Sequence, residues 1–169
     1  WNSFDESVNL MAAGEVVVES MWSPAVTALR VRGFPVRYAA PKEGYRGWHG
    51  GIMLNKQATG KVLDACYEYL NWWLSGWAGS VVARQGYYFS IPENAKKYLS
   101  QAEWEYWYEG KPASEDLLDP FGNVVVKKGE VRDGGSLEDR VCKIGIAVWN
   151  SVMDNHQYLV TKWNEFLNA

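Results

Sequence analysis

Cysteine and histidine are scarce in this sequence, and long apolar runs are missing. Two cysteines and two histidines occur among 169 residues, without a CxxC pair or a His/Cys cluster, so neither a zinc site nor a disulfide scaffold is predicted. As free thiols, Cys66 and Cys142 are expected to be small buried hydrophobic residues. The apolar stretch at 70–74 is far shorter than the ~20 residues that a membrane-spanning helix needs. No metal and no membrane span are therefore expected.

An excess of charge of one sign is also lacking. Lys and Arg number 17 against 20 Asp and Glu, which gives a net charge of −3 with both signs interspersed. This balance produces no positive electrostatic field that would attract a polyanion, so a nucleic-acid partner is not expected. With 47% apolar and 22% charged residues, the chain has the composition of a folded globular domain.

Aromatic residues, in contrast, are abundant. Ten Trp, ten Tyr and five Phe make up 15% of the chain. Packing in a core is the ordinary use of such rings, because each buries a large apolar area. A cage of rings that stacks on a ligand or attracts a cation is the other use. Both interpretations stay open for each ring.

Short helical patterns alternate with short β-branched runs in the first half of the chain. Ser3 with Glu6 three residues later predicts a capped helix closed by Gly14, and Ser23-Pro24 predicts the start of another. The expected helices cover residues 3–13, 24–33, 61–74 and 78–85, and the expected strands cover residues 16–18, 36–39 and 52–54. This alternation predicts an α/β fold with a mainly parallel sheet.

The second half of the chain has a different pattern. From residue 91, prolines and glycines separate short helical turns, and we expect this segment to wrap over a surface. Residues 137–166 carry one apolar stripe that includes Ile144, Val148 and Val152. This stripe predicts one long terminal helix or two abutting helices.

No group of residues has the pattern of a catalytic site. His49 and His156 have no nucleophile in a recognisable motif beside them. The glycine-rich loop at 44–51 lacks the GK[ST] ending of a phosphate-binding loop. Carboxylates are scattered on segments expected to be exposed. The sequence therefore predicts a protein that is not an enzyme and uses no cofactor.

Several motifs occur in a specific order along nearly the whole chain. They are AGEVVV at 13–18, MWS at 21–23, PKEG at 41–44 followed by Trp48, the helix at 61–74 with Asn71, GY at 86–87, WNSVMD at 149–154 and KWNEF at 162–166. In order and spacing they resemble the C-terminal half of the bacterial periplasmic solute-binding proteins of the spermidine/putrescine family. The last two motifs resemble one branch annotated for polyamine transport.

This resemblance implies a portion of the two-lobe, type II periplasmic-binding-protein fold, with the N-terminal half absent. Residues 1–48 and 98–169 would belong to the second lobe, and residues 49–97 would form a segment of the first. The helices of that segment would expose apolar faces, which makes dimerisation of this piece plausible.

The resemblance also implies partners and a location. The partners would be a small-molecule solute and the membrane permease of an ABC importer. The chain begins with Trp1 and has no basic-then-apolar leader, so we expect a processed or excised piece without its signal peptide. The location would be periplasmic, or extracellular with a lipid anchor in a Gram-positive host.

Members of the family hold a polyamine between aromatic walls and carboxylate ends in the cleft between the lobes. The matching positions here are Trp22 with its neighbour Ser23, Trp48, Tyr87 and, more loosely, Trp149. Each ring is a reasonable stacking or cation–π partner. Core packing is the alternative, and it is equally favoured for Trp149.

One departure concerns the ligand. The family's Trp-x-Asp is Trp48-His49-Gly50 here, so the expected carboxylate is absent and polyamine specificity is in doubt. Arg46 and His49 stand beside this position, and such donors suit a carboxylate or a polyhydroxy ligand. Glu19 is the candidate to restore a negative charge. Each of these three side chains could instead have a structural role or point into solvent without contacting a ligand.

Two alternatives to solute binding remain open. In a structural or interaction module, the aromatic residues would form only core and partner surface. A carbohydrate-active enzyme is a more distant alternative, because it would require two carboxyl groups facing one cleft about 5–9.5 Å apart.

Overall fold

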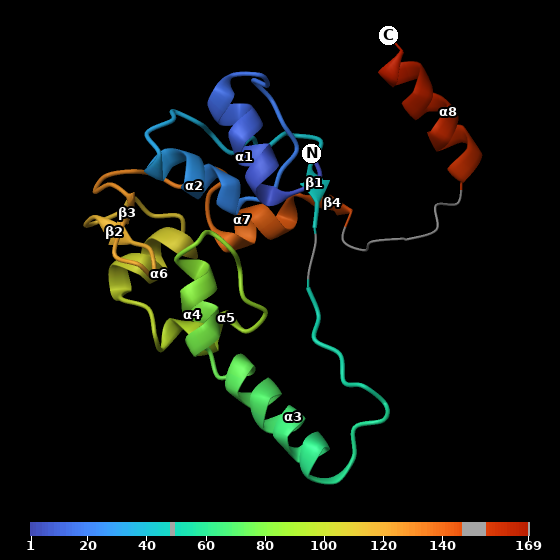
Figure 1. Cartoon of the computed structure of the whole chain (residues 1–169). Coiled ribbons are helices and arrows are strands. Elements are labelled where there is room, and N and C mark those ends of the chain that lie inside the picture. The colour runs from blue at the N-terminus through green and yellow to red at the C-terminus, as the bar shows by residue number, and fades with distance from the viewer. Residues whose placement is uncertain (48–49, 147–154, 169) are drawn as a thin grey trace.

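Helices make up most of the regular structure in this computed structural model, which describes residues 1–47, 50–146 and 155–168 (Figure 1). The helices are α1 (Phe4–Ala13), α2 (Pro24–Val31), α3 (Gly60–Leu74), α4 (Trp77–Ala83), α5 (Pro92–Lys96), α6 (Gln101–Trp107), α7 (Leu137–Cys142) and α8 (His156–Leu167). The strands are β1 (Tyr45–Arg46), β2 (Leu117–Leu118), β3 (Val124–Val126) and β4 (Ile144–Ile146). Strand β1 pairs with β4 in parallel, and β2 pairs with β3 antiparallel.

The helices expected in the first half of the chain are confirmed as α1 to α4, with small differences at their ends. At the start of α1, the Ser3 hydroxyl accepts a hydrogen bond of 3.1 Å from the Glu6 amide. The Glu6 carboxylate accepts from the amide of Asn2. Both contacts satisfy amides that have no partner within the helix.

The three expected strands are wrong, because residues 16–18, 36–39 and 52–54 lie in loops. Val17 and Val18 are 88% and 85% exposed. A β-branched run forms a strand only where a neighbouring strand pairs with its backbone, and no described residue pairs with these runs. The only sheets among the described residues have two strands each, so the expected mainly parallel sheet does not form there.

Within the segment from residue 91 that was expected to wrap over a surface, residues 101–126 form most of the larger buried core, so the expectation is wrong for this part. Its buried members lie on α6, on the loop after it and on the β2–β3 hairpin. They are Ala102, Tyr106, Trp107, Tyr108, Ala113, Leu117, Val125 and Val126, together with Ala83 of α4. The contact with Ala83 means that α4 and the later segment share one core.

A smaller core holds α1 against α2. It consists of Val8, Ala25 and Leu29, with Phe4 and Met11 packed beside them. Phe4, Val8 and Met11 recur at the spacing of one helical face, which explains why α1 buries this side.

The C-terminal part does not form one long helix. Among the described residues it consists of α7, β4 and α8, and Ile144 lies in β4 opposite Tyr45. Val148 and Val152 lie outside the described residues. Cys142 is exposed and Cys66 is half-buried, so the expectation that both are buried is wrong.

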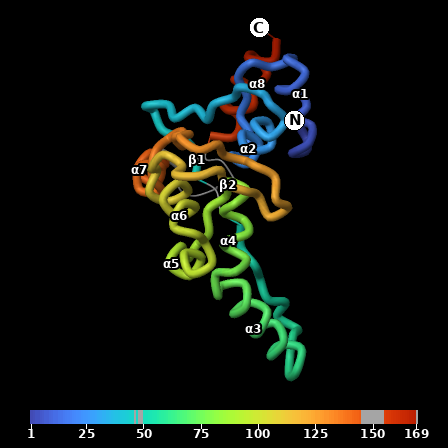
Figure 2. The backbone as a smooth tube through the Cα atoms, turned by 90° about the vertical axis from the view of Figure 1, so that its left-hand side faces the viewer, coloured from blue at the N-terminus to red at the C-terminus, as the bar shows by residue number. Residues whose placement is uncertain are grey.

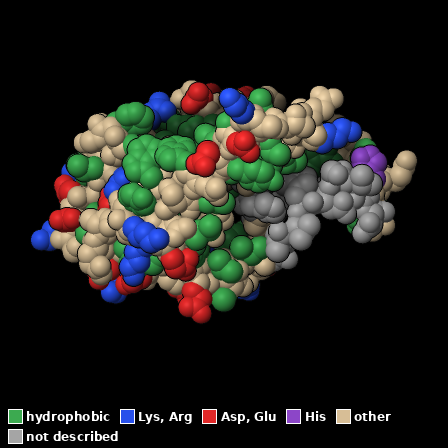
Figure 3. Space-filling view, turned by 90° about the horizontal axis from the view of Figure 1, so that it is seen from below, with side chains coloured by type: hydrophobic (Ala, Val, Ile, Leu, Met, Phe, Trp, Pro, Cys, Tyr) green, Lys and Arg blue, Asp and Glu red, His purple; other side chains and the backbone are tan. Residues whose placement is uncertain are grey.

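Helices α3 and α8 differ from the other described helices, because neither buries a residue. None of the fifteen residues of α3 is buried, and all of α8 is exposed. Figure 1 shows both projecting away from the other helices, and Figure 2 shows α3 continuing past α4 and α5. Hydrophobic side chains gather in patches on the face seen from below in Figure 3. The exposed apolar faces expected for the helices of residues 49–97 are thus observed for α3 but not for α4, which buries Ala78 and Ala83.

Candidate functional site

The structure joins two segments that the sequence placed in one site. The Ser23 hydroxyl, at the start of α2, donates a hydrogen bond of 3.3 Å to the carbonyl oxygen of Gly86. Trp22 and Tyr87 are the neighbours of these residues in the chain. The backbone segments that carry two of the predicted ligand-binding rings therefore meet.

Gly86 has the conformation and the space that only glycine accepts. Its φ is +90°, and a Cβ there would lie 3.0 Å from the Thr27 hydroxyl of α2. The Gly86 amide donates to the Ala83 carbonyl and the Tyr87 amide to the Val82 carbonyl, which closes α4 with a Schellman turn. This turn brings the chain against the first turn of α2.

The two predicted rings differ in their surroundings. Trp22 is 44% exposed, and its ring lies 5.6 Å from the ring of Trp1 and 6.4 Å from that of Phe4 between centroids. Tyr87 is half-buried, and burial raises the pKa of its phenol. Trp22 therefore belongs to a small aromatic cluster beside α1 and still presents a large part of its surface to solvent.

The remaining predicted residues are described in part. Glu19 is half-buried, and its Oε2 atom is buried without a hydrogen-bond partner in the described part of the chain. Arg46 lies in β1, and its side chain is not among the described ones. Trp48, His49 and Trp149 lie outside the described residues.

A polar cavity of about 30 Å³ adjoins the Ser23–Gly86 contact. Ser23 and Gly86 line it, as do three arginines and a single carboxylate, namely Arg30, Arg132, Arg140 and Asp133. Arg30 and Asp133 form an ion pair of 2.7 Å, and the same Asp133 oxygen accepts a hydrogen bond of 2.9 Å from the Tyr38 amide. Asp133 thus holds α2 and the segment after it against the loop before α7.

Apart from Ser23 and Gly86, no residue of this cavity was predicted from the sequence. Arg132 and Asp133 are adjacent in the chain, and Gly134 and Gly135 directly follow them. A charged pair followed by two glycines is typical of a tight turn that holds polar side chains in place. That pattern is the signal that was available, although Arg30 and Arg140 lie too far away in the chain for any spacing rule to join them.

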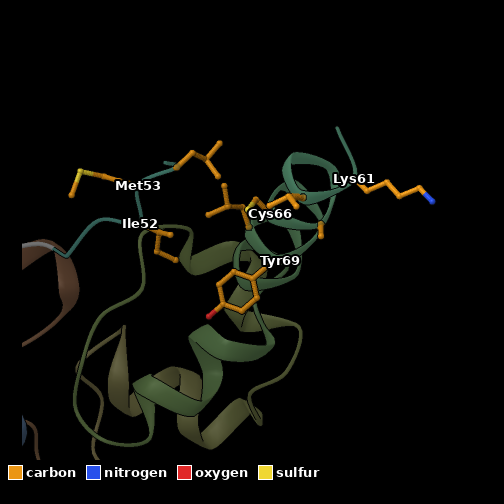
Figure 4. Close-up of a pocket in the computed structure, with 9 residues that line it drawn as sticks. Ile52, Met53, Lys61, Cys66 and Tyr69 are labelled. Atoms are coloured by element: carbon orange, nitrogen blue, oxygen red, sulfur yellow. The ribbon is translucent and has the colours of Figure 1, made fainter. Parts of the chain in front are cut away.

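An apolar groove of about 490 Å³ lies on another part of the molecule, between the loop at 52–54 and α3. Ile52, Cys66 and Tyr69 are among the residues that line it, and the side chain of Lys61 points away from it (Figure 4). The groove offers contact area and few polar groups. It therefore lacks the means to fix the orientation of a polar solute.

The described residues contain no group of three or more His, Cys, Asp or Glu side chains that could hold a metal ion. No helix in the described ranges combines the length and the apolar character of a membrane span.

Comparisons with models of protein families and with solved structures found no match to this chain. The family resemblance drawn from the sequence motifs therefore stays a prediction.

Proposed function

We propose that this chain is part of an extracellular solute-binding component of an ABC importer, which holds a polyamine-like or related small polar solute between aromatic side chains. The observation that carries the proposal is the hydrogen bond between Ser23 and Gly86. It joins the segments of Trp22 and Tyr87, which the family resemblance assigns to one ligand site. Trp22 presents 44% of its surface to solvent, and exposed aromatic surface can stack on a solute.

Glu19 supports a solute that carries an ammonium group. A buried carboxylate oxygen without a hydrogen-bond donor costs free energy, and the Oε2 atom of Glu19 is such an oxygen. An ammonium group supplies both hydrogen bonds and opposite charge. Glu19 would thus replace the carboxylate that the family has at the position of Gly50.

A structural or interaction module is the second candidate function. The contacts of Trp22 with Trp1 and Phe4 favour it, because they are also the contacts of a packing residue. In this alternative, the exposed apolar faces of α3 and α8 would be the surfaces that meet a partner.

The test measures binding of putrescine, spermidine and a sugar acid to the natural full-length protein by thermal shift and calorimetry. We expect saturating putrescine or spermidine to raise the melting temperature, because a ligand that binds only the folded state stabilises it. Absence of a shift and of binding heat with every solute would favour the interaction module.

Two matched pairs of variants locate the ammonium site. Glu19→Gln should weaken putrescine binding by about tenfold, whereas Glu15→Gln, at an exposed position nearby, should not. Gly50→Asp should strengthen it, and Gly51→Asp should have less effect. If the two variants of each pair changed binding equally, neither Glu19 nor position 50 would contact the ammonium group.

A further inference from the structure

Two arginines of the polar cavity are buried without a carboxylate of their own. Arg132 and Arg140 are each 7% exposed, and neither forms an ion pair within the described ranges. Asp133 is engaged by Arg30 and by the Tyr38 amide. Because buried charges in proteins are normally paired or bound to a ligand, these two residues require an explanation.

Arg132 is held by neutral groups. Its guanidinium donates to the carbonyl oxygens of Trp107 and Gly86. It lies 4.7 Å from the ring centroid of Tyr88 and 4.9 Å from that of Trp107. Burial, together with the positive charge of Arg140, lowers the pKa of Arg132 to about 10. Its surroundings therefore stabilise the positive charge less than water does.

Arg140 is held in a similar way but less completely. One Nη atom donates to the Asp133 carbonyl at 3.1 Å, and the guanidinium lies 4.4 Å from the ring centroid of Tyr38. Its Nε atom is buried and has no hydrogen-bond partner among the described residues. An arginine Nε only donates, so the missing partner is an acceptor.

A second buried donor of the cavity lacks an acceptor. The indole Nε1 of Trp107 has no partner in the described part of the chain, and Trp107 is 4% exposed and lines the cavity. Like arginine, tryptophan has no acceptor in its polar group. Arg132, Arg140 and Trp107 line the same small cavity, so an excess of positive charge surrounds it, and two of these residues carry an unpaired donor atom.

Arg84 provides an internal comparison. It joins α4 to α6 through two hydrogen bonds to the Glu103 carboxylate, at 2.5 and 3.1 Å. Its side chain is 24% exposed, so it is less buried than Arg132 or Arg140 and still has a full counter-charge. In this chain, therefore, a less buried arginine has a carboxylate partner, whereas the two more deeply buried arginines have none.

We propose that the cavity between Arg132, Arg140 and Trp107 binds a small monovalent anion, either a halide such as chloride or the carboxylate group of a small molecule. A volume of about 30 Å³ exceeds the roughly 10–15 Å³ that one water needs. It suits a single ion or a two-oxygen group and is too small for a polyamine. The anion accepts hydrogen bonds from the donors and offsets the charge. This proposal does not depend on the solute proposed above, although Ser23 and Gly86 also line the cavity.

The first experiment measures the line width of the chloride-35 NMR signal in the presence of the protein. Sodium chloride is the probe, and sodium gluconate, whose anion is too large for the cavity, keeps the ionic strength constant. We expect the native protein to broaden the signal. Arg140→Gln should lose most of this broadening, whereas Arg37→Gln should retain it, because Arg37 is exposed and does not line the cavity. Equal broadening by both variants overturns the proposal.

The second experiment identifies the source of the anion and does not depend on the folding of Arg140→Gln. The melting temperature of the native protein is measured while chloride, bromide, formate or acetate replaces gluconate. A rise with the halides alone assigns a halide site, and a rise with formate or acetate assigns a carboxylate group. Trp107→Phe keeps an aromatic ring and removes the donor. It should weaken the affinity for the anion about tenfold. No dependence on any of the four anions overturns the proposal.

Discussion

Helices α6 and α3 differ in how they use an apolar face. Helix α6 has seven residues, of which Ala102, Glu103, Tyr106 and Trp107 are buried. Helix α3 has fifteen residues and a clear apolar stripe, yet it buries none. The periodicity of a sequence therefore identifies a helix but does not say whether anything packs against it.

The contacts around α6 explain its position. Ser100 and Glu103 form a capping box, and the Glu103 carboxylate also binds Arg84, the residue directly after α4. Tyr106 and Trp107 complete the larger core. Helix α3 has no side-chain cap at its first turn. Because isolated helices of this length are marginal in water, its stability depends on its contacts with α4.

The largest expected difference in stability is between alanine variants of two tyrosines, one in each of these helices. Tyr106→Ala in α6 should lower the free energy of unfolding by about 3–5 kcal/mol, because it leaves a cavity in the core. Tyr69→Ala in α3 should lower it by less than about 1 kcal/mol, since Tyr69 is 52% exposed. Urea denaturation of both variants measures the difference. Similar losses would mean that α3 is as well packed as α6.

The next effect tests the junction between α3 and α4. Gly76 has a φ of +108°, and a Cβ there would lie 2.1 Å from the Asn94 carbonyl oxygen. Gly76→Ala should therefore destabilise the protein by about 2–4 kcal/mol through strain and a clash. Gly122→Ala, at a φ of +88° with open space around it, is the control and should cost about 1 kcal/mol. A thermal melt in which both variants behave alike would rule out the close approach to Asn94.

A smaller effect is expected at acid pH. Burial alone would raise the pKa of the Glu103 carboxyl, but hydrogen bonds from Arg84 and Ser100 outweigh it and hold the pKa below its usual value of 4.5. This contribution to stability is complete above pH 4.5 and is lost as the pH falls through the lower pKa of the folded state. Glu103→Gln should lower the free energy of unfolding by about 2 kcal/mol at pH 7.

The difference between Glu103→Gln and the native protein should shrink as the pH falls below 4. Denaturant unfolding at a series of pH values measures it. The exposed Glu115→Gln is the control and should follow the native curve. A pH-independent difference for Glu103→Gln would show that the ion pair with Arg84 is not the cause.

The smallest effect concerns the surface of α3. Val62 is 63% exposed and lines the apolar groove, so Val62→Ser should change the free energy of unfolding by less than about 0.5 kcal/mol. If the exposed stripe drives dimerisation, sedimentation velocity should show less self-association in this variant. Val125→Ser, at a buried position, is the control for destabilisation. A large loss of stability in Val62→Ser would contradict the exposure of α3.

The helices could be predicted because their signals are local. Ser3 and Gly14 mark the two ends of α1, and Pro24 marks the start of α2. Each of these residues acts on backbone groups within a few positions of itself. The strands could not be predicted, because β-branched runs such as residues 16–18 need a partner that lies elsewhere in the chain. Ile144 shows the converse, since it pairs with Tyr45 although its spacing suggested a helix.

The candidate site could be predicted only in part. The motifs placed Ser23 and Tyr87 in one site, and the structure brings their segments together through Gly86. The arginine cavity was not foreseen. Its lining comes from segments spread over the chain, and what distinguishes Arg132 and Arg140 is a missing counter-charge, which depends on burial. Burial of a polar residue follows from packing and has no signature in a single sequence.

The long sequence separations around this cavity have a consequence for how the protein forms. Arg30 meets Asp133 across 103 positions, and the Tyr45 hydroxyl meets the Arg140 carbonyl across 95. Contacts between such distant segments close large loops. The chain loses the entropy of loop closure before the contact stabilises it. During synthesis, Arg30 remains hydrated until the segment around Asp133 has left the ribosome. The N-terminal third is therefore synthesised well before the arginines can be enclosed, and a nascent chain that stops short of residue 132 lacks Arg132, Asp133 and Arg140.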